Sequence, residues 1–368
     1  MNILSSNNLN PKSIFRFFEK DKSILGVDIG TSSLKIVQAR KEKERAVLET
    51  YGELSTAAYG SGEAGRAALL MDEKVSEMIV DLRKEAGVTA KRAIVSVPLR
   101  YSFITVMDMP ELSDKDLAEA VPYEARRYIP IPIAEVALSW SRIQTEEGGE
   151  NQQKPKTTVL LVAVQREIGE KYHRIIEGAG LEYAGSQVEV FASSRLSGTR
   201  LHQVHVCIDI GAVSTKISIV DSGVVRAVHN VDRASQQLSI AISQSLGVDF
   251  KRAETMKQEL GMVQRPEAAG IRHTISPLLD AIFDEVDRLR SDYRRKTGKV
   301  IDKAVLLGGG SLMPGLLDYA IERLGIEVLL ANPFNQFEYP VFLQQKLKSI
   351  SPIFGVSASL TLWGLHDQ

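Results

Sequence analysis

Two stretches of the chain decide the fold: Asp28-Ile29-Gly30-Thr31-Ser32-Ser33-Leu34-Lys35 and its echo Asp209-Ile210-Gly211-Ala212-Val213-Ser214-Thr215-Lys216. Each follows a short apolar run and precedes a run in which apolar and polar residues alternate. This pattern predicts a strand, a tight glycine turn and a second strand, with hydroxyls, backbone N–H groups and one carboxylate at the tip. The Asp, Gly and Lys occupy the same offsets in both copies, which begin 209 − 28 = 181 residues apart. Two matched hairpins indicate duplicated half-domains that face each other across a cleft.

The composition is that of an ordinary globular protein with room for two or more domains. The chain has 368 residues, of which 44% are hydrophobic and 25% charged. Its formal net charge of −1 provides no basic field for nucleic acid. Cys207 is the only cysteine, which excludes an internal disulfide and fits a reducing compartment, and its apolar strand predicts a buried, inert thiol. The chain shows no apolar run long enough for a transmembrane helix and no secretory signal, so we expect a cytoplasmic protein.

Composition and pattern divide the chain into four parts. Residues 1–22 form a polar, flexible leader with a short amphipathic segment, which either docks on a membrane or partner or packs onto the domain. Residues 23–91 and 166–200 make up the first half, and residues 201–368 the second, with an outer subdomain over about 232–300. Between the two parts of the first half lies an α+β insertion at 92–165.

The insertion is predicted from alternating strands and one capped helix. Ser113 opens a helix that reaches about Tyr128, and Pro122 is expected to kink or divide it. The polar stretch 144–156 predicts a flexible hairpin loop. In the second half, a strand at 303–307 leads into three glycines, and Pro314 is expected in the first turn of the following helix.

The paired hairpins carry the groups that a nucleoside triphosphate needs. Glycine turns present backbone N–H groups to phosphate oxygens without a Cβ in the way. Mg²⁺ keeps several waters and is usually held by one or two carboxylates together with phosphate, a role that Asp28 and Asp209 could fill. Lys35 or Lys216 could add positive charge, although each lies in an alternating strand where it could also face solvent.

Two further motifs remain ambiguous when they are taken singly. Gly308-Gly309-Gly310-Ser311 follows a strand, where bare backbone could meet a base or phosphate or simply form a tight strand–helix joint. Glu254 and Lys257 share a helix face and could grip ribose hydroxyls or form a surface ion pair. The Gly308–Ser311 stretch is not a GxGxxG motif, and the chain contains no GxxxxGK[ST] motif, so the Rossmann and P-loop interpretations of this stretch fail.

The combination of motifs resembles the actin/Hsp70/sugar-kinase superfamily over about residues 22 to 365. Within it, the chain is most similar to the PilM family of type IV pilus assembly proteins, relatives of the division protein FtsA. The more specific marks are the leader before Ile24-Leu25-Gly26-Val27-Asp28-Ile29-Gly30, the insertion with Tyr123-Glu124-Ala125-Arg126-Arg127-Tyr128-Ile129-Pro130, and Glu189-Val190-Phe191-Ala192. The resemblance implies an α/β, actin-like (ribonuclease H-like) fold with duplicated domains around a nucleotide cleft and an FtsA-type α+β insertion in the first half.

The resemblance also implies a site for ATP or ADP with Mg²⁺ between the halves. Asp28 and Asp209 would hold the metal through water, Arg252-Ala253-Glu254-Thr255-Met256-Lys257 looks like the family's ribose-side helix, and Thr215 matches its phosphate-2 threonine. The implied cofactor-binding residues are Gly30, Thr31, Ser32, Ser33, Lys35, Gly211, Ala212, Val213, Ser214, Thr215, Glu254, Lys257, Gly308, Gly309, Gly310 and Ser311.

The sequence departs from the family pattern at two places that bear on ATP hydrolysis. Val231-Asp232-Arg233-Ala234-Ser235 stands where relatives usually carry a Gly-Gly turn, and Ala212-Val213-Ser214 offers fewer free N–H groups than the loops of active kinases. We therefore expect slow ATP hydrolysis or none, and the sequence indicates no catalytic base.

The partner implied by the resemblance is a PilN-like inner-membrane pilus protein. Its N-terminal cytoplasmic peptide would bind a groove between the first half and the insertion, which would place the chain at the inner membrane through that partner. Other platform components, motor ATPases and self-association are further possibilities, and nucleic acid is not expected. Two alternatives remain: an FtsA-like division or filament protein, whose relatives end in a basic amphipathic helix that Leu360–Gln368 lacks, and a small-molecule kinase.

Overall fold

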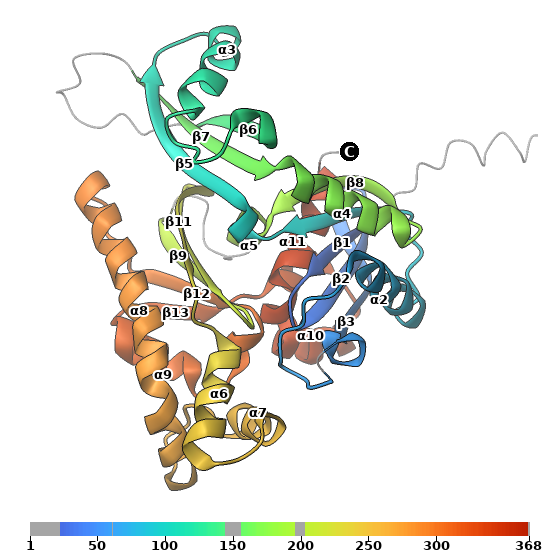
Figure 1. Cartoon of the computed structure of the whole chain (residues 1–368), viewed down its shortest axis with the longest axis vertical. Helices are drawn as coiled ribbons and strands as arrows, with labels where there is room; N and C mark the ends of the chain where they lie inside the picture. The colour runs from blue at the N-terminus through green and yellow to red at the C-terminus, as the bar shows by residue number, and fades with distance from the viewer. Residues whose placement is uncertain (1–22, 61, 144–155, 196–202, 367–368) are drawn as a thin grey trace, which may run out of the picture.

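The computed structural model describes residues 23–60, 62–143, 156–195 and 203–366. The expected leader, and nearly all of the expected loop at 144–156, lie outside the described residues. Figure 1 shows two α/β halves side by side, with a small three-stranded unit above them. Among the described residues, none of the helices combines the length and the apolar character needed to cross a bilayer.

The first half is built on a six-stranded sheet whose predicted hairpin is present. Strands β1 and β2 pair antiparallel and place Asp28 opposite Lys35 at the tip. In spatial order the strands are β14 (Phe337–Glu338), β3 (Arg45–Ser55), β2 (Ser33–Glu42), β1 (Ser23–Ile29), β4 (Arg92–Val97) and β8 (Glu182–Val188).

Alternating residues of β1 supply two separate cores, because successive side chains of a strand point to opposite faces. Leu25 and Val27 pack with the helices of one face, and Ile24 packs with those of the other. The helices are α2 (Asp72–Glu85) and α4 (Arg166–Gly178) on the first face, and α5 (Glu189–Ser194), α10 (Gln344–Ile350) and α11 (Gly355–His366) toward the second.

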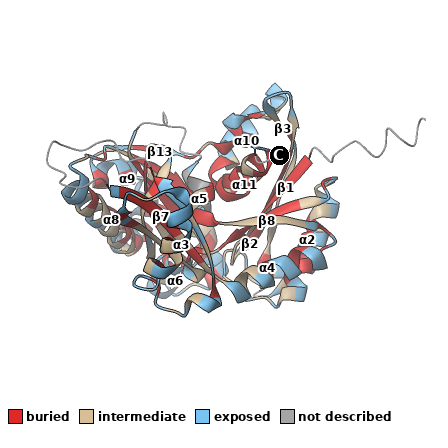
Figure 2. Cartoon of the chain, turned by 90° about the horizontal axis from the view of Figure 1, so that it is seen from above, coloured by how far each residue is buried: buried red, intermediate tan, exposed pale blue. Residues whose placement is uncertain are grey.

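Helix α11 lies directly against β1, and almost all of it is buried (Figure 2). A Cβ on Gly26 would come within 2.1 Å of the Ser357 carbonyl oxygen, so this approach requires glycine. The Gly26 N–H donates to the Thr361 hydroxyl at 3.1 Å, and that hydroxyl lies 2.8 Å from the Val37 carbonyl. The otherwise apolar helix is thus fixed to the sheet by a buried polar contact.

The second half repeats this plan with a five-stranded sheet. Strands β9 and β10 pair antiparallel and place Asp209 opposite Lys216, as β1 and β2 place Asp28 and Lys35. Cys207 is buried as predicted, and burial raises the pKa of its thiol to about 12. The elements are β11 (Val224–Val231), β10 (Thr215–Asp221), β9 (His205–Ile210), β12 (Lys303–Leu307) and β13 (Glu327–Leu330), with helices α6 (Ser235–Leu246), α7 (Phe250–Glu259), α8 (Ala269–Thr297) and α9 (Leu316–Leu324).

The insertion is a separate antiparallel sheet covered by one helix. The strands β5 (Ser102–Pro110), β7 (Lys156–Gln165) and β6 (Val136–Ile143) lie in that spatial order. Helix α3 (Asp114–Ala125) buries Leu117 and Val121 on this sheet. Pro122 lies within α3, so the expectation that it could divide the helix is wrong.

Strand pairing corrects two of the expected boundaries. Strand β4 lies between β1 and β8 in the first sheet, so residues 92–97 belong to the first half and the insertion starts after them. Strand β14 pairs with β3, and α11 packs on β1, so the end of the chain belongs to the first half rather than the second. Pro314 precedes α9 and its Gly315 N-cap instead of standing in the first turn.

Candidate functional site

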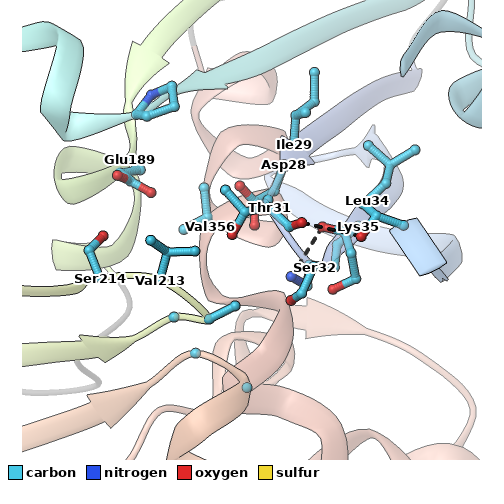
Figure 3. Close-up of a pocket in the computed structure, with 18 of the residues that line it drawn as sticks. Asp28, Ile29, Thr31, Ser32, Leu34, Lys35, Glu189, Val213, Ser214 and Val356 are labelled. Carbon is cyan, nitrogen blue, oxygen red and sulfur yellow. Dashed lines mark hydrogen bonds between the residues drawn. The ribbon is translucent and has the colours of Figure 1, made fainter. Parts of the chain in front are cut away.

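A cavity of about 610 Å³ lies between the two halves, with the two hairpin tips on opposite walls (Figure 3). Thr31 and Ser32 extend into it from one side, and Val213 and Ser214 from the other. Most of the residues predicted from the sequence line this cavity: Asp28, Gly30, Thr31, Ser32, Ser33, Lys35, Asp209, Gly211, Ala212, Val213, Ser214, Glu254, Gly308, Gly309 and Gly310. Three do not, and lie behind it: Thr215, Lys257 and Ser311.

The two turns have the same local geometry. The Gly30 N–H donates to the Ser33 carbonyl at 3.1 Å, and the Gly211 N–H donates to the Ser214 carbonyl at 3.2 Å. A Cβ on Gly30 or on Gly211 would come within 2.8 or 2.9 Å of the same carbonyl oxygens. The duplication seen in the sequence is therefore a duplication of backbone shape, and each turn leaves its tip residues facing the cavity.

Three carboxylates (Asp28, Glu189 and Asp209) and two lysines (Lys35 and Lys216) form a largely buried charged cluster in the cavity wall. Lys216 Nζ lies 3.1 Å from Glu189 Oε2 and 3.9 Å from Asp209 Oδ2. Asp28 Oδ1 accepts from the Ser96 hydroxyl at 2.9 Å. The cluster thus joins both hairpins to the first residue of α5.

Burial and the neighbouring charges together set the pKa values of this cluster. Burial raises the pKa of Asp28, and raises the pKa of Asp209 to about 6, with Lys216 opposing the rise and Glu189 and Asp28 adding to it. Burial favours the neutral amine of Lys216, but the charges of Glu189 and Asp209 prevail and raise the pKa of Lys216. Negative charge therefore exceeds positive charge at a buried place, which favours a further cation.

The residues fit a hydrated Mg²⁺ better than a directly ligated metal. Within the described part of the chain, no group of three or more His, Cys, Asp or Glu side chains could hold a metal. Asp28 and Asp209 offer one carboxylate from each half, which is the donor set that Mg²⁺ uses when waters and phosphate oxygens complete its shell.

Glu254 faces the cavity, whereas Lys257 supports it from behind. Lys257 Nζ lies 2.8 Å from Glu254 Oε2 and 2.7 Å from the Ser235 hydroxyl. The two side chains are buried, so the interpretation of a surface ion pair is wrong. Burial lowers the pKa of Lys257. Lys257 thus holds the carboxylate of Glu254 in place, and a direct contact of Lys257 with a ribose stays a prediction.

The triple glycine is both a tight joint and a cavity wall. Gly308 has φ +82°, and a Cβ there would come within 2.4 Å of Asp209 Oδ1. A Cβ on Gly310 would meet the Ile210 side chain at 2.4 Å, whereas Gly309 faces open space. The Ser311 hydroxyl donates to the Gly308 carbonyl at 2.7 Å and is buried. Of this motif, only the glycines remain exposed to a ligand.

Thr215 also has a structural role. Its hydroxyl donates to the Arg233 carbonyl at 2.7 Å and is fully buried. The Gln236 N–H donates to the Ala212 carbonyl at 3.0 Å, and the Ser235 N–H donates to the Gly211 carbonyl at 3.1 Å. These bonds attach the start of α6 to the second turn, although the Gly-Gly of relatives is absent.

Sequence reasoning did not assign Glu189 to the site, and it left Lys216 without a definite role. Lys216 could have been selected because it stands at the same offset as Lys35. Glu189 has no such local signal, since only the fold brings the start of α5 to the two hairpins. Arg100, Tyr101 and Lys171 also line the cavity and come from the first half and the root of the insertion.

Comparison with known structures agrees with this architecture. The chain is similar to the PilM-PilN type IV pilus biogenesis complex, with 26% identity over 93% of this chain and 98% of that chain and a TM-score of 0.78. The ethanolamine utilization protein EutJ from Carboxydothermus hydrogenoformans matches at 16% identity over 92% of this chain and 89% of its own, with a TM-score of 0.56. The expected actin-like fold, with its FtsA-type insertion in the first half, is confirmed.

Sequence comparison gives the same assignment. The cell division protein FtsA of Streptococcus pneumoniae serotype 2 is 22% identical over 356 residues, which cover 84% of this chain and 75% of FtsA. A family model described as type IV pilus assembly protein PilM matches residues 26–364. The chain therefore belongs to the PilM family of type IV pilus assembly proteins.

Proposed function

We propose that this chain is an ATP-binding scaffold of a type IV pilus assembly platform, whose conformation depends on the nucleotide. Mg²⁺-ATP would bind between the two hairpin turns, and closure of the cleft would set whether a membrane partner can dock. A ligand that binds one conformation better shifts the population toward it, so regulation of this kind needs no turnover.

The observation that carries the nucleotide proposal is the cavity between the duplicated turns. Both turns direct their tips into it, and each half contributes one aspartate, the buried Asp209 and the partly buried Asp28. The first turn would hold phosphate through the backbone of 30–33, and the second through 211–214. Asp28 and Asp209 would hold the hydrated metal, and Glu254 and the open face of Gly309 would meet the nucleoside.

The geometry of Glu189 supports slow hydrolysis. A general base must be able to accept a proton from an attacking water. Glu189 Oε1 already accepts from the Leu99 N–H at 2.8 Å, and Oε2 pairs with Lys216 Nζ at 3.1 Å. Both carboxylate oxygens are engaged, which leaves this group poorly suited to activate water.

The partner in this proposal is the N-terminal cytoplasmic peptide of a PilN-like protein of the inner membrane. The supporting observation is the likeness to the PilM-PilN complex, which extends over nearly the whole chain. The peptide would bind between the first half and the insertion, and the chain would be cytoplasmic and peripheral to the membrane through this partner.

A single-turnover experiment tests the nucleotide part. Bound ATP and released phosphate are followed together with Mg²⁺, and Asp209→Ala serves as the comparison. Tight ATP retention with little phosphate release, lost in Asp209→Ala, is expected. Rapid phosphate release that a sugar accelerates would instead indicate a small-molecule kinase, and absence of ATP binding would refute the proposal.

The match to FtsA favours one second candidate, a protein that forms filaments. Sedimentation of the purified chain with and without Mg²⁺-ATP distinguishes the two. A scaffold stays in the supernatant at micromolar concentration, whereas a filament protein pellets when nucleotide is present.

A further inference from the structure

Residues 62–71 belong to the first half and contact the second half across one side of the cavity. We call this segment, which lies between β3 and α2 in the first half, the strap. Gly65, Ala68, Leu69 and Leu70 of the strap line the cavity. The side chain of Leu69 is 91% exposed and that of Met71 75%, whereas Leu70 packs against the hydrophobic core of the first half.

The strap is fixed to the first half at the phosphate turn. The Ala68 N–H donates to the Thr31 carbonyl at 2.9 Å. The Thr56 N–H, at the start of the segment leading to the strap, donates to the Ser32 carbonyl at 3.0 Å. The strap therefore moves with the tip of the first hairpin.

The neighbouring residues of the strap contact the second half. The Ala67 N–H donates to Gln236 Oε1 of α6 at 2.8 Å. The Arg66 guanidinium lies over the Phe250 ring of α7, 5.5 Å from its centroid. Gln236 is itself bonded to the second turn through the Ala212 carbonyl. One short path of hydrogen bonds thus joins the first phosphate turn to the second.

Gly65 brings the strap against the nucleoside side of the cavity. It has φ +80°, and a Cβ there would come within 2.6 Å of the Glu254 carboxyl carbon. Gly62, also with positive φ (+69°), has nothing within 4 Å of its Cβ position. The close approach at Gly65 is specific to the contact with α7.

We propose that the strap is a latch that holds the cleft closed, and that its release from α6 and α7 limits the exchange of the bound nucleotide. The halves cannot separate on this side until the contacts of Gly65, Arg66 and Ala67 break, while the bond of Ala68 to the first turn can remain. The inference rests on the proposed nucleotide site and adds the element that controls access to it.

The contacts are few, which makes the latch reversible. One hydrogen bond and one partly exposed cation–π contact are weak individually, so their loss changes an opening equilibrium by roughly five- to tenfold each. Contacts this weak allow the cleft to open by thermal motion alone, without a partner protein.

The test is the release rate of a fluorescent ATP analogue from the full chain, chased with excess ATP in Mg²⁺. Gln236→Ala removes the acceptor of the Ala67 N–H, and Gly65→Ala forces the strap away from Glu254. Both variants are expected to release the analogue about five- to tenfold faster than the wild type. Gly62→Ala, which adds the same methyl group at positive φ without a contact, is expected to match the wild type.

A covalent closure provides the converse test. Ala67→Cys combined with Gln236→Cys is joined by a short bismaleimide, and Cys207 does not compete because it is only 2% exposed. Cross-linking the two cysteines after the fluorescent analogue has bound is expected to slow its release at least tenfold relative to the sample without cross-linker.

Three results would overturn the latch: release from Gln236→Ala and Gly65→Ala at the wild-type rate, equal acceleration by Gly62→Ala, or unchanged release after joining. A wild-type chain that binds no analogue would refute the proposed function itself, which separates the two failures.

Discussion

Asp209 is a buried carboxylate whose charge we propose serves a ligand rather than the fold. Its pKa of about 6 lies above the ordinary value of 3.8 because burial penalises the ionised form. A group whose pKa is raised in the folded state gives stability that is complete at low pH and is lost as pH rises through the folded pKa. In the free protein, the ionised Asp209 therefore lowers the free energy of unfolding at neutral pH.

Asp209→Asn should accordingly stabilise the free protein at pH 8 relative to the wild type, by up to about 3 kcal/mol, and give little gain at pH 4. The difference should grow between pH 4 and pH 6. Denaturant unfolding at a series of pH values measures it, and the variant should also lose ATP binding. A gain in stability that does not depend on pH would contradict this explanation.

Lys216 balances the carboxylates of the cluster. Lys216→Met leaves Glu189 and Asp209 buried without their cation, and such removal of one partner usually costs about 3–5 kcal/mol. Lys35→Met is the comparison variant, because Lys35 stands at the same offset and lies near enough to Asp28 to lower its pKa, but its Nζ lies 3.5 Å from the Ser33 carbonyl and forms no ion pair among the described residues. Denaturant unfolding should show a loss for Lys216→Met at least twice that for Lys35→Met, and equal losses would contradict the assigned role.

At the scale of elements, the sheet of the first half depends on the close approach of α11 to Gly26. Gly26→Ala places a methyl group 2.1 Å from a backbone oxygen, which neither element can avoid by a rotamer change. We expect a loss of about 3 kcal/mol in the free energy of unfolding. Gly169→Ala in α4 adds a methyl group in open space and should be neutral or stabilise by roughly 0.5–1 kcal/mol. If both variants unfold at the same denaturant concentration, α11 does not pack as described.

The sequence was sufficient for elements whose signal is local. Both hairpins, α2 and β12 were predictable because alternation, apolar stripes and glycine turns lie within a few residues of each other. The sheet to which β4 belongs was not predictable, because its neighbours β1 and β8 are far away in sequence. The same applies to β14 and α11, which return to the first half from the end of the chain.

The residues of the candidate site divide in the same way, into those with a local sequence signal and those that depend on the fold. The turn residues and the two aspartates could be identified from matched offsets in the sequence. Whether Thr215, Lys257 and Ser311 face a ligand or support the wall depends on packing, which their sequence positions do not reveal. Glu189 could be recognised only when the fold had brought it to Lys216.

At the scale of the whole molecule, Glu189 connects the proposed nucleotide site to the insertion. It pairs with Lys216 in the cleft and accepts from the Leu99 N–H in the short 3₁₀ helix Leu99–Tyr101, from which β5 starts. Arg100 and Tyr101 of that helix line the cavity. A change in the charge of the cleft thus has a direct structural path to the subdomain proposed to hold the partner.

The most direct test of the central claim is the affinity of the chain for a PilN-like N-terminal peptide, measured by calorimetric titration without nucleotide, with ADP and with Mg²⁺-ATP. The account predicts that ATP changes the dissociation constant by at least about fivefold, since coupled sites commonly differ by that factor or more. Glu189→Gln should reduce this difference while the peptide still binds. Equal peptide affinity in all three states, with ATP shown to be bound, would contradict the claim that the nucleotide controls docking.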